Sequence, residues 1–119
     1  MERHINIVEI MRFILNSGKP KAFPFWRITD IFDYVLFSLV TGNILVCAEE
    51  GEITGILLFR INDRIFHISH IIVKTKTALK KFIGYYKLRY SACCVEGERR
   101  GKVRVYNKLE RTLNLIQRL

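Results

Sequence analysis

The sequence predicts one domain of the α/β (α+β) class, with a small, mostly antiparallel sheet of about four strands flanked by helices. Two observations lead to this fold class. Segments whose apolar residues recur at helical spacing lie toward both ends of the chain, and short apolar, β-branched segments separated by turn residues lie between them. The 119 residues, half of them hydrophobic, can build one core without disulfides or a metal. Residues 1–119 are therefore expected to form a single domain.

Two helices are expected before the first strand. Residues His4–Asn16 place apolar side chains at i, i+3, i+4 and i+7, as an amphipathic helix does. The second helix, Asp30–Thr41, follows the possible capping pair Thr29-Asp30 and precedes Gly42, a residue type that commonly ends helices. Its inward face is expected to consist of Ile31, Phe32, Val35, Leu36 and Leu39. The loop between the helices carries aromatic residues that either cap the core or form a ligand-facing wall: Phe23, Phe25 and Trp26.

Three strands joined by tight turns are expected next. Ile44–Glu49 and Ile53–Ile61 flank Glu50-Gly51-Glu52, which is a hairpin signal, and Asn62–Arg64 turns the chain into Ile65–Val73. The third strand is apolar on both faces, so it is expected to lie in the interior of the sheet with helices on both sides. Strict alternation places four of its residues on one face: Phe66, Ile68, His70 and Ile72.

The remaining chain is expected to form a helix, a short strand and a second helix. Lys74–Thr77 is a turn, Ala78–Tyr90 is a basic helix with an apolar stripe, and Ala92–Val95 is a buried strand. After a Glu/Arg/Gly turn, apolar residues recur at helical spacing from Val105 onward. This spacing indicates a second basic helix that packs beside the first.

The positive charge is concentrated in the second half of the chain. Residues 1–60 carry 6 Lys and Arg against 7 Asp and Glu, whereas residues 61–119 carry 14 against 4, and the two halves together give the net charge of +9. This asymmetry favours an anionic partner, such as nucleic acid, a phosphorylated cofactor, an acidic protein or a membrane surface. A solvated basic face without a partner would give the same composition.

Other sequence features limit the class of protein. The 3 cysteines show no zinc spacing and are expected to be free thiols, and no metal site is expected. The longest apolar run, Ile28–Val46, is interrupted by Asp30 and Asp33 and makes a poor membrane span. No signal peptide is evident, so a cytoplasmic location is expected.

The order of the expected elements resembles the GNAT (acyl-CoA N-acyltransferase) superfamily over roughly Thr29 to Arg111. Ile65–Val73 leads directly into a helix, where the family places its pyrophosphate-binding turn, and Val105–Leu109 is similar to the family's hydrophobe-Tyr-x-Lys-hydrophobe segment. The resemblance implies acetyl-CoA as cofactor, with Tyr106 as the general acid toward the departing CoA thiolate. It also implies four lysines around the pyrophosphate: Lys74, Lys76, Lys80 and Lys81.

A base for the acceptor amine would be needed for acyl transfer. The candidates are His67, His70 and Glu96. The two histidines could equally be hydrogen-bonded residues of the core, because both lie on the expected interior strand. Glu96 could equally be paired with the arginines that follow it.

The chain also departs from the family pattern. Val73–Lys81 contains no glycine, whereas the family's Gln/Arg-x-x-Gly-x-Gly/Ala turn uses glycine to bring the backbone close to the pyrophosphate. Glu110-Arg111 stands where the family has Gly-Phe. The family's last two strands are not evident before Leu119, so an edge strand of the sheet is expected to need cover, and a homodimer could provide it.

These observations favour a non-catalytic, GNAT-like basic protein that uses no cofactor and binds an anionic partner, either nucleic acid or an acidic protein. It is similar to small GNAT-like proteins of bacteriophages, some of them virion-associated, so a virion in the host cytoplasm is a second possible location. Nucleic-acid phosphates would contact the four lysines named above together with further cations on the two basic helices: Lys87, Arg89, Arg99, Arg100, Lys102 and Arg104. The alternative is an active acetyl-CoA-dependent N-acyltransferase.

Overall fold

The computed structural model describes residues 5–17, 22–89, 94–99 and 102–106. Three helices and five strands lie within these residues. In chain order they are α1 (Ile7–Ser17), α3 (Ile28–Thr41), β1 (Ile44–Glu49), β2 (Glu52–Asn62), β3 (Ile65–Val73), α4 (Lys76–Arg89), β4 (Cys94–Arg99) and β5 (Lys102–Tyr106).

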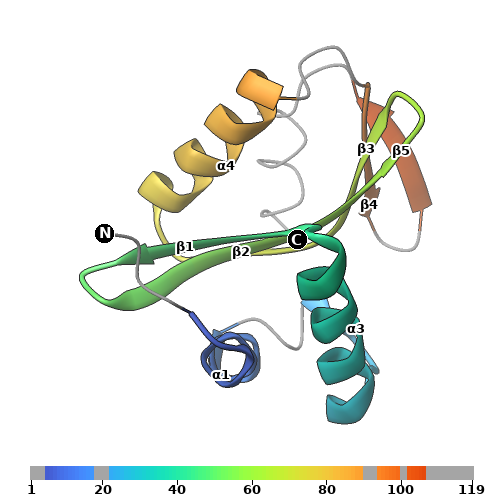
Figure 1. Ribbon diagram of the computed structural model, residues 1–119. Helices are drawn as coiled ribbons and strands as arrows, with labels where there is room; N and C mark the ends of the chain where they lie inside the picture. Colours follow the sequence, from blue (N-terminus) through green and yellow to red (C-terminus); the bar gives the residue numbers. More distant parts are fainter. Residues whose placement is uncertain (1–4, 18–21, 90–93, 100–101, 107–119) are drawn as a thin grey trace.

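The described strands form one sheet in the order β1-β2-β3-β4-β5. The first three strands form an antiparallel meander, β4 and β5 form a second antiparallel pair, and β3 and β4 are parallel. Helix α4 makes the crossover between these parallel strands (Figure 1). The predicted α+β class and the interior position of β3 are therefore confirmed.

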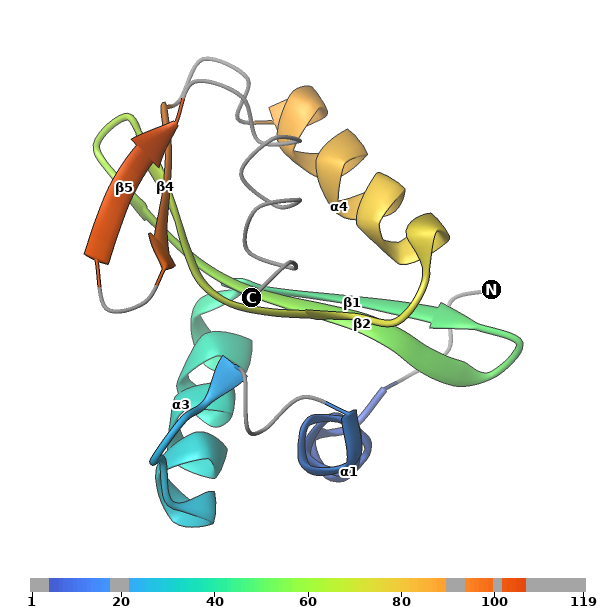
Figure 2. The same ribbon diagram turned by 180° about the vertical axis from the view of Figure 1, so that it is seen from behind.

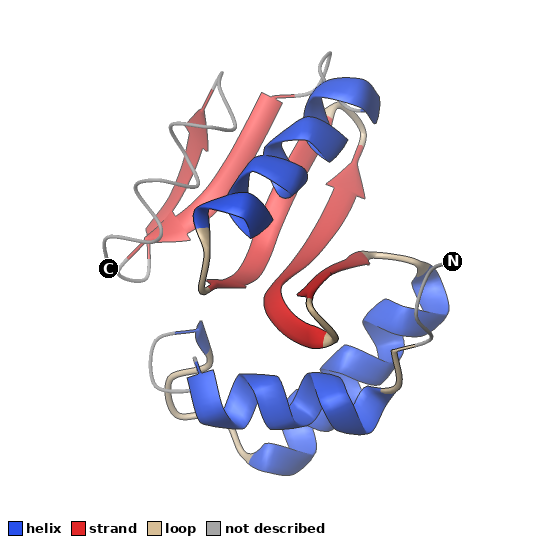
Figure 3. Cartoon of the chain, turned by 90° about the vertical axis from the view of Figure 1, so that its left-hand side faces the viewer, coloured by secondary structure: helices blue, strands red, loops and turns tan. Residues whose placement is uncertain are grey.

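The sheet separates two helical layers. Helices α1 and α3 cover one face, and α4 covers the other (Figures 1 and 2). Figure 3 shows the same three layers from the side. Each layer has its own group of buried apolar side chains, one between α4 and the sheet and one between the sheet and the α1–α3 pair. The central strands are thus buried on both faces, which explains why their sequences are apolar throughout.

Helix α3 has no side-chain cap at its N-terminus, whereas a glycine ends it at its C-terminus. It begins at Ile28, and the preceding Arg27 makes no side-chain capping hydrogen bond, so the predicted cap at Thr29-Asp30 was wrong. Its C-terminus is as predicted: Gly42 has a φ of 74°, and its N–H donates to the carbonyl of Leu39. A glycine there avoids the steric cost that a Cβ meets in the left-handed region.

The inward face of α3 also differs from the prediction. Ile31, Val35 and Ser38 are buried, whereas Phe32 and Leu36 are exposed. Ser38 is tolerated in the core because its hydroxyl donates to the carbonyl of Tyr34, 2.9 Å away. Since α3 is apolar around most of its circumference, periodicity alone could not identify the side that faces the sheet.

A β-bulge in β3 overturns the predicted alternation of that strand. Leu58 pairs with His70 and Phe59 pairs with Ile68, so Ser69 is the extra residue. Its hydroxyl is buried and has no hydrogen-bond partner among the described residues. On one side of the bulge, Ile68 faces α4, and on the other, His70 faces α1 and α3. The prediction that all four alternate residues share one face was therefore wrong.

The end of the described chain is a strand where a helix was predicted. Residues Lys102–Tyr106 form β5, which pairs with β4 in an antiparallel hairpin. Val103 and Val105 alternate there with polar residues, a period-two pattern that competes with the helical spacing counted from Val105. The sheet has five strands within the described residues, one more than predicted. The rest of the predicted second helix, residues 107–119, lies outside the described residues.

Candidate anion-binding site

The outer face of α4 carries a group of exposed ammonium groups. Ala78, Phe82 and Tyr86 point inward and are buried against the sheet. The side chains on the opposite face are exposed and mostly basic: Lys76, Lys80, Lys81 and Lys87. The helix contains no acidic residue, so no carboxylate on α4 neutralises these lysines. The predicted outward direction of Lys80, Lys81 and Lys87 is confirmed.

Three of these lysines form one ridge along the helix. At 100° per residue, Lys76, Lys80 and Lys87 lie within about 40° of one another around the helix axis and span about 16 Å along it. Gly84 lies beside these lysines, about 40° around the axis from Lys80 and one turn further along the helix. It is exposed, and a Cβ built there would have no neighbour within 4 Å. We call Lys76, Lys80, Gly84 and Lys87 the basic ridge. It is a convex, positively charged surface with one point at which a partner could approach the helix backbone.

The N-terminus of α4 is occupied by a carboxylate from another element. The Thr75 hydroxyl accepts a hydrogen bond from the N–H of Ala78, 3.1 Å away, and donates to Oε2 of Glu49, 2.7 Å away. Hydrogen bonds from Thr54 and Thr75 lower the pKa of Glu49, and the charge of Lys81 acts in the same direction. An ionised carboxylate at a helix N-terminus is also favoured by the helix dipole. Glu49 thus places a negative charge beside the residue that caps α4.

The four lysines expected around a pyrophosphate do not lie together. Lys76, Lys80 and Lys81 belong to α4, whereas the ammonium of Lys74 lies 5.9 Å from the ring centroid of Phe13, on the α1 side of the sheet. The sheet alternation explains this placement. Val73 packs against the α4 layer, so the next residue points to the opposite face.

The predicted basic stripe over two adjacent helices is divided in the structure. Arg99, Lys102 and Arg104 lie on the β4–β5 hairpin, which forms the far edge of the sheet. Figure 1 shows this hairpin well separated from α4. Arg89 is the last residue of α4, and Arg100 lies outside the described residues. The continuous part of the predicted stripe is therefore the α4 face alone.

His70 is held in an aromatic cluster. Its Nδ1 lies 2.6 Å from the carbonyl oxygen of Ala22, and its ring stacks on Phe23 with a centroid distance of 4.0 Å. Trp26 and Tyr34 meet the same ring edge-on. A carbonyl oxygen only accepts hydrogen bonds, so Nδ1 carries the proton in the neutral imidazole. Phe23 and Trp26 thus cap the core as one of the two predictions had it, Phe25 is exposed, and His70 attaches this loop to β3.

Burial lowers the pKa of His70 to about 4, against the smaller opposing effect of its hydrogen bond to Ala22. A general base is most effective when its pKa lies near the working pH. His70 is therefore poorly suited to accept a proton from an amine at neutral pH. Its contacts are those of a hydrogen-bonded core residue, which is one of the two alternatives that the sequence left open.

The other candidate catalytic residues are placed by the strand register. His67 pairs with Glu96 across the parallel strands β3 and β4, and this pairing ends at Ile68 and Gly97. Tyr106 pairs with Val95 on the opposite edge of β4. His70 lies beyond the last β3–β4 pair, so it is separated along the strand from His67 and Glu96. The register brings together His67 and Glu96, but it does not bring His70 to them.

Neither a metal-ligand cluster nor a membrane-spanning helix is found in the part of the chain that the structure describes. No group of three or more His, Cys, Asp or Glu side chains is placed to hold a metal ion among the described residues. None of the described helices combines the length and the apolar character that a membrane span needs. Cys47 is a buried free thiol.

Comparison of the chain with protein-family models, with curated proteins and with solved structures gives no match. The GNAT resemblance remains a prediction based on the order of the elements.

Proposed function

We propose that this protein is a non-catalytic, GNAT-like basic protein that binds an anionic macromolecule through the outer face of α4. The observation that carries this proposal is the basic ridge on a helix without any carboxylate. Lysine side chains on a convex helix can reach phosphates without reading base edges, which gives affinity with little sequence preference. A nucleic-acid backbone is the partner with the highest density of such charges, and an acidic protein surface is the other candidate of this class.

Two features support a non-catalytic role. Glu49 already provides an anion at the N-terminus of α4, so a bound pyrophosphate would be repelled there. The candidate base His70 has a lowered pKa and is fixed between β3 and the loop. Neither feature affects the outer face of α4, where the exposed lysines lie.

The test is a binding titration with a fluorescent DNA duplex at 50 and 200 mM salt. If Lys76, Lys80 and Lys87 each contact one phosphate, the slope of log K against log salt should be about −3. The Lys80→Glu variant should bind about tenfold more weakly. Arg60→Glu is the charge-matched control, because Arg60 is exposed on β2 and its charge acts on His70, on the side of the sheet opposite α4.

Equal losses of DNA affinity in both variants would mean that binding depends only on the net charge of the protein, and the proposed site would be wrong. Failure to bind DNA, together with salt-dependent binding to polyglutamate that Lys80→Glu weakens, would identify an acidic protein as the partner. Binding to neither polymer would overturn the proposal.

A second candidate function is acetyl-CoA-dependent N-acyl transfer. The observation in its favour is the path of the chain, in which β3 leads through a short turn into α4 and α4 leads into the parallel strand β4. The GNAT resemblance implies a pyrophosphate site at this turn, Lys80 and Lys81 near it, and Tyr106 as the general acid.

Acetyl-CoA should then raise the melting temperature, and Lys80→Glu should abolish the increase. Glu49→Gln should enlarge it, because this change removes a negative charge from the site without altering its shape. A melting temperature that acetyl-CoA leaves unchanged in both the original chain and Glu49→Gln would exclude this function.

A further inference from the structure

The α1–α3 side of the sheet exposes an apolar surface. Ile28, Phe32, Leu36 and Val40 recur every four residues along α3, and all four are exposed. Residues at this spacing form a continuous ridge on the surface of a helix, and packed helices commonly interlock through such ridges. Helix α3 therefore has an apolar ridge facing outward as well as an apolar side facing the sheet. A helix with apolar residues on both sides is normally covered on both sides.

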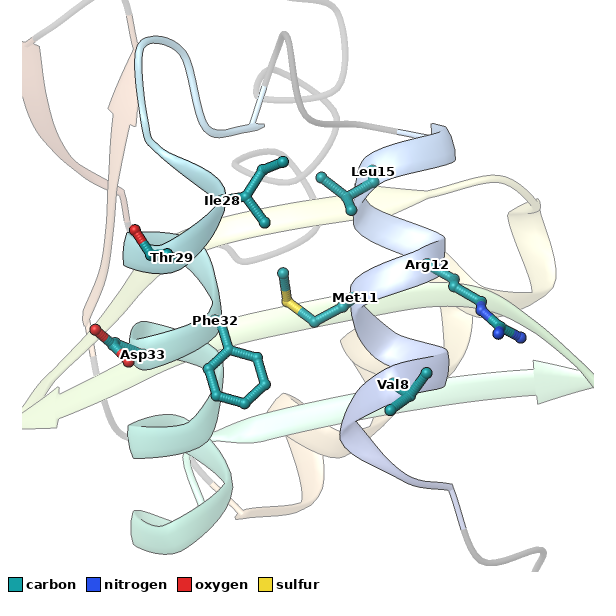
Figure 4. Close-up of a pocket in the computed structure, with 8 residues that line it drawn as sticks. All are labelled: Val8, Met11, Arg12, Leu15, Ile28, Thr29, Phe32 and Asp33. Atoms are coloured by element: carbon teal, nitrogen blue, oxygen red, sulfur yellow. The ribbon is translucent and has the colours of Figure 1, made fainter.

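A groove runs beside this ridge, between α1 and α3 (Figure 4). It has a volume of about 420 Å³, and its apolar walls come from Val8, Met11 and Leu15 of α1 and from Ile28 and Phe32 of α3. The two helices face each other across it in Figure 4, and Figure 1 shows that their axes are inclined to one another. Arg12 lies on the α1 rim and Asp33 lies on the α3 rim, so the two rims carry opposite charges.

We propose that this face binds the same face of a second copy of the chain. A two-fold axis running along the groove would place α3 of each copy over α1 of the other. Each α3 would then cross α1 of the second copy, with the ridge of one helix packed against the surface of the other. Asp33 of each copy would face Arg12 of the second copy, and this ion pair would occur twice because the interface is isologous.

The charge pattern favours a second copy over an unrelated helix. A purely acidic or purely basic partner would be attracted by one rim of the groove and repelled by the other. The same groove turned about a two-fold axis matches both rims at once. Six large apolar side chains of the ridge and the groove are accessible on each copy, and the dimer would cover them: Val8, Leu15, Ile28, Phe32, Leu36 and Val40.

This interface is distinct from the sheet-edge pairing predicted from the sequence. It is also independent of the proposed anion binding, because α4 lies on the opposite face of the sheet. The oligomeric state of the protein can therefore be tested without any ligand.

The experiment is sedimentation velocity of the full chain over a range of concentrations. The original chain should be a dimer at micromolar concentration. Ile28→Glu should weaken the dimer at least tenfold, and folding should be unaffected because Ile28 is 55% exposed and a glutamate is favourable in the first turn of a helix. Phe37→Ser is the matched control, since Phe37 is 61% exposed on α3 but lies off the ridge. Circular dichroism checks the fold of each variant.

A charge exchange tests the orientation of the two copies. Asp33→Arg and Arg12→Asp should each weaken the dimer, and the double variant should restore it. A monomeric original chain would overturn the proposal, and so would a dimer that Ile28→Glu leaves intact. A double variant as weak as the single ones would overturn the proposed two-fold arrangement.

Discussion

Phe25 adopts a backbone conformation that its side chain disfavours. It has a φ of 67° and follows Pro24 in a turn closed by a hydrogen bond from the N–H of Trp26 to the carbonyl of Phe23, 3.3 Å long. A proline followed by a residue of positive φ is the type II pattern, in which the third position favours glycine. The side chain is fully exposed, so no packing within the described residues offsets the strain.

Phe25→Gly should therefore stabilise the fold by about 0.5–1 kcal/mol. Relief of the left-handed conformation contributes roughly 1–2 kcal/mol, and the greater freedom of glycine in the unfolded chain removes part of this gain. Urea denaturation measures the difference. Phe25→Ala is the control, because alanine keeps the Cβ that causes the strain. Equal stabilities for the glycine and alanine variants would contradict the prediction.

His70 should make the stability of the fold depend on pH in a predictable direction. Its pKa is lowered from 6.5 to about 4 in the folded state, so between these values the unfolded chain binds more protons than the folded one. Stability is then fully present above pH 6.5 and falls as the pH is lowered toward 4, by at most roughly 3 kcal/mol.

The measurement is urea denaturation at pH 7, 6 and 5. His70→Phe should be less stable at pH 7, because the carbonyl of Ala22 loses its donor, but its stability should change less between pH 7 and 5. Parallel curves for the two proteins would show that His70 does not cause the pH dependence.

The contact between α4 and β2 depends on a glycine. A Cβ at Gly55 would lie 2.9 Å from the Cβ of Ala78 and 3.2 Å from the ring of Phe82. Gly55→Ala should therefore force α4 away from the sheet and cost about 1–3 kcal/mol. Gly84→Ala is the matched comparison within the same layer. Its Cβ would meet nothing within 4 Å, so the helix propensity of alanine should add about 1 kcal/mol of stability. Thermal unfolding of both variants measures whether each substitution lowers or raises the stability. A Gly55→Ala variant as stable as the original chain would contradict the tight packing between α4 and β2.

The elements that the sequence predicts well are those with local signals. Gly42 ends α3, and the Glu50-Gly51 turn closes the first hairpin, with both residues at positive φ. The outward face of α4 was predictable because its lysines recur opposite an apolar stripe. In each case the residues that determine the structure are close together in the sequence, so no distant contact is needed to predict it.

The features that could not be predicted depend on distant contacts or on two competing patterns. The bulge at Ser69 is hidden because β3 is apolar on both faces, so an extra residue leaves no trace in the alternation. The contact between Glu49 and Thr75 joins residues 26 positions apart. The strand alternation of Lys102–Tyr106 meets the helical spacing that begins at Val105, and pairing with β4 decides between them.

At the scale of the whole molecule, the sheet places two different surfaces on opposite sides. The basic ridge lies on the α4 side, and the apolar groove lies on the α1–α3 side (Figures 1 and 2). A dimer formed through the α1–α3 side would leave both α4 helices on its outer surfaces. If each α4 face binds one segment of nucleic acid, such a dimer is bivalent and can join two separate segments.

This arrangement predicts that the dimer bridges DNA duplexes and that the monomer does not. Beads carrying one duplex should capture a second, fluorescent duplex when the original chain is added at low salt. Ile28→Glu should bind the immobilised duplex with an unchanged salt slope, because its α4 is intact, but it should not capture the second duplex. Lys80→Glu should weaken both activities, since DNA binding by each copy in the dimer is weakened. Capture by the Ile28→Glu monomer would show that bridging arises from more than one site on a single copy, and the link between the dimer and bivalent binding would then be wrong.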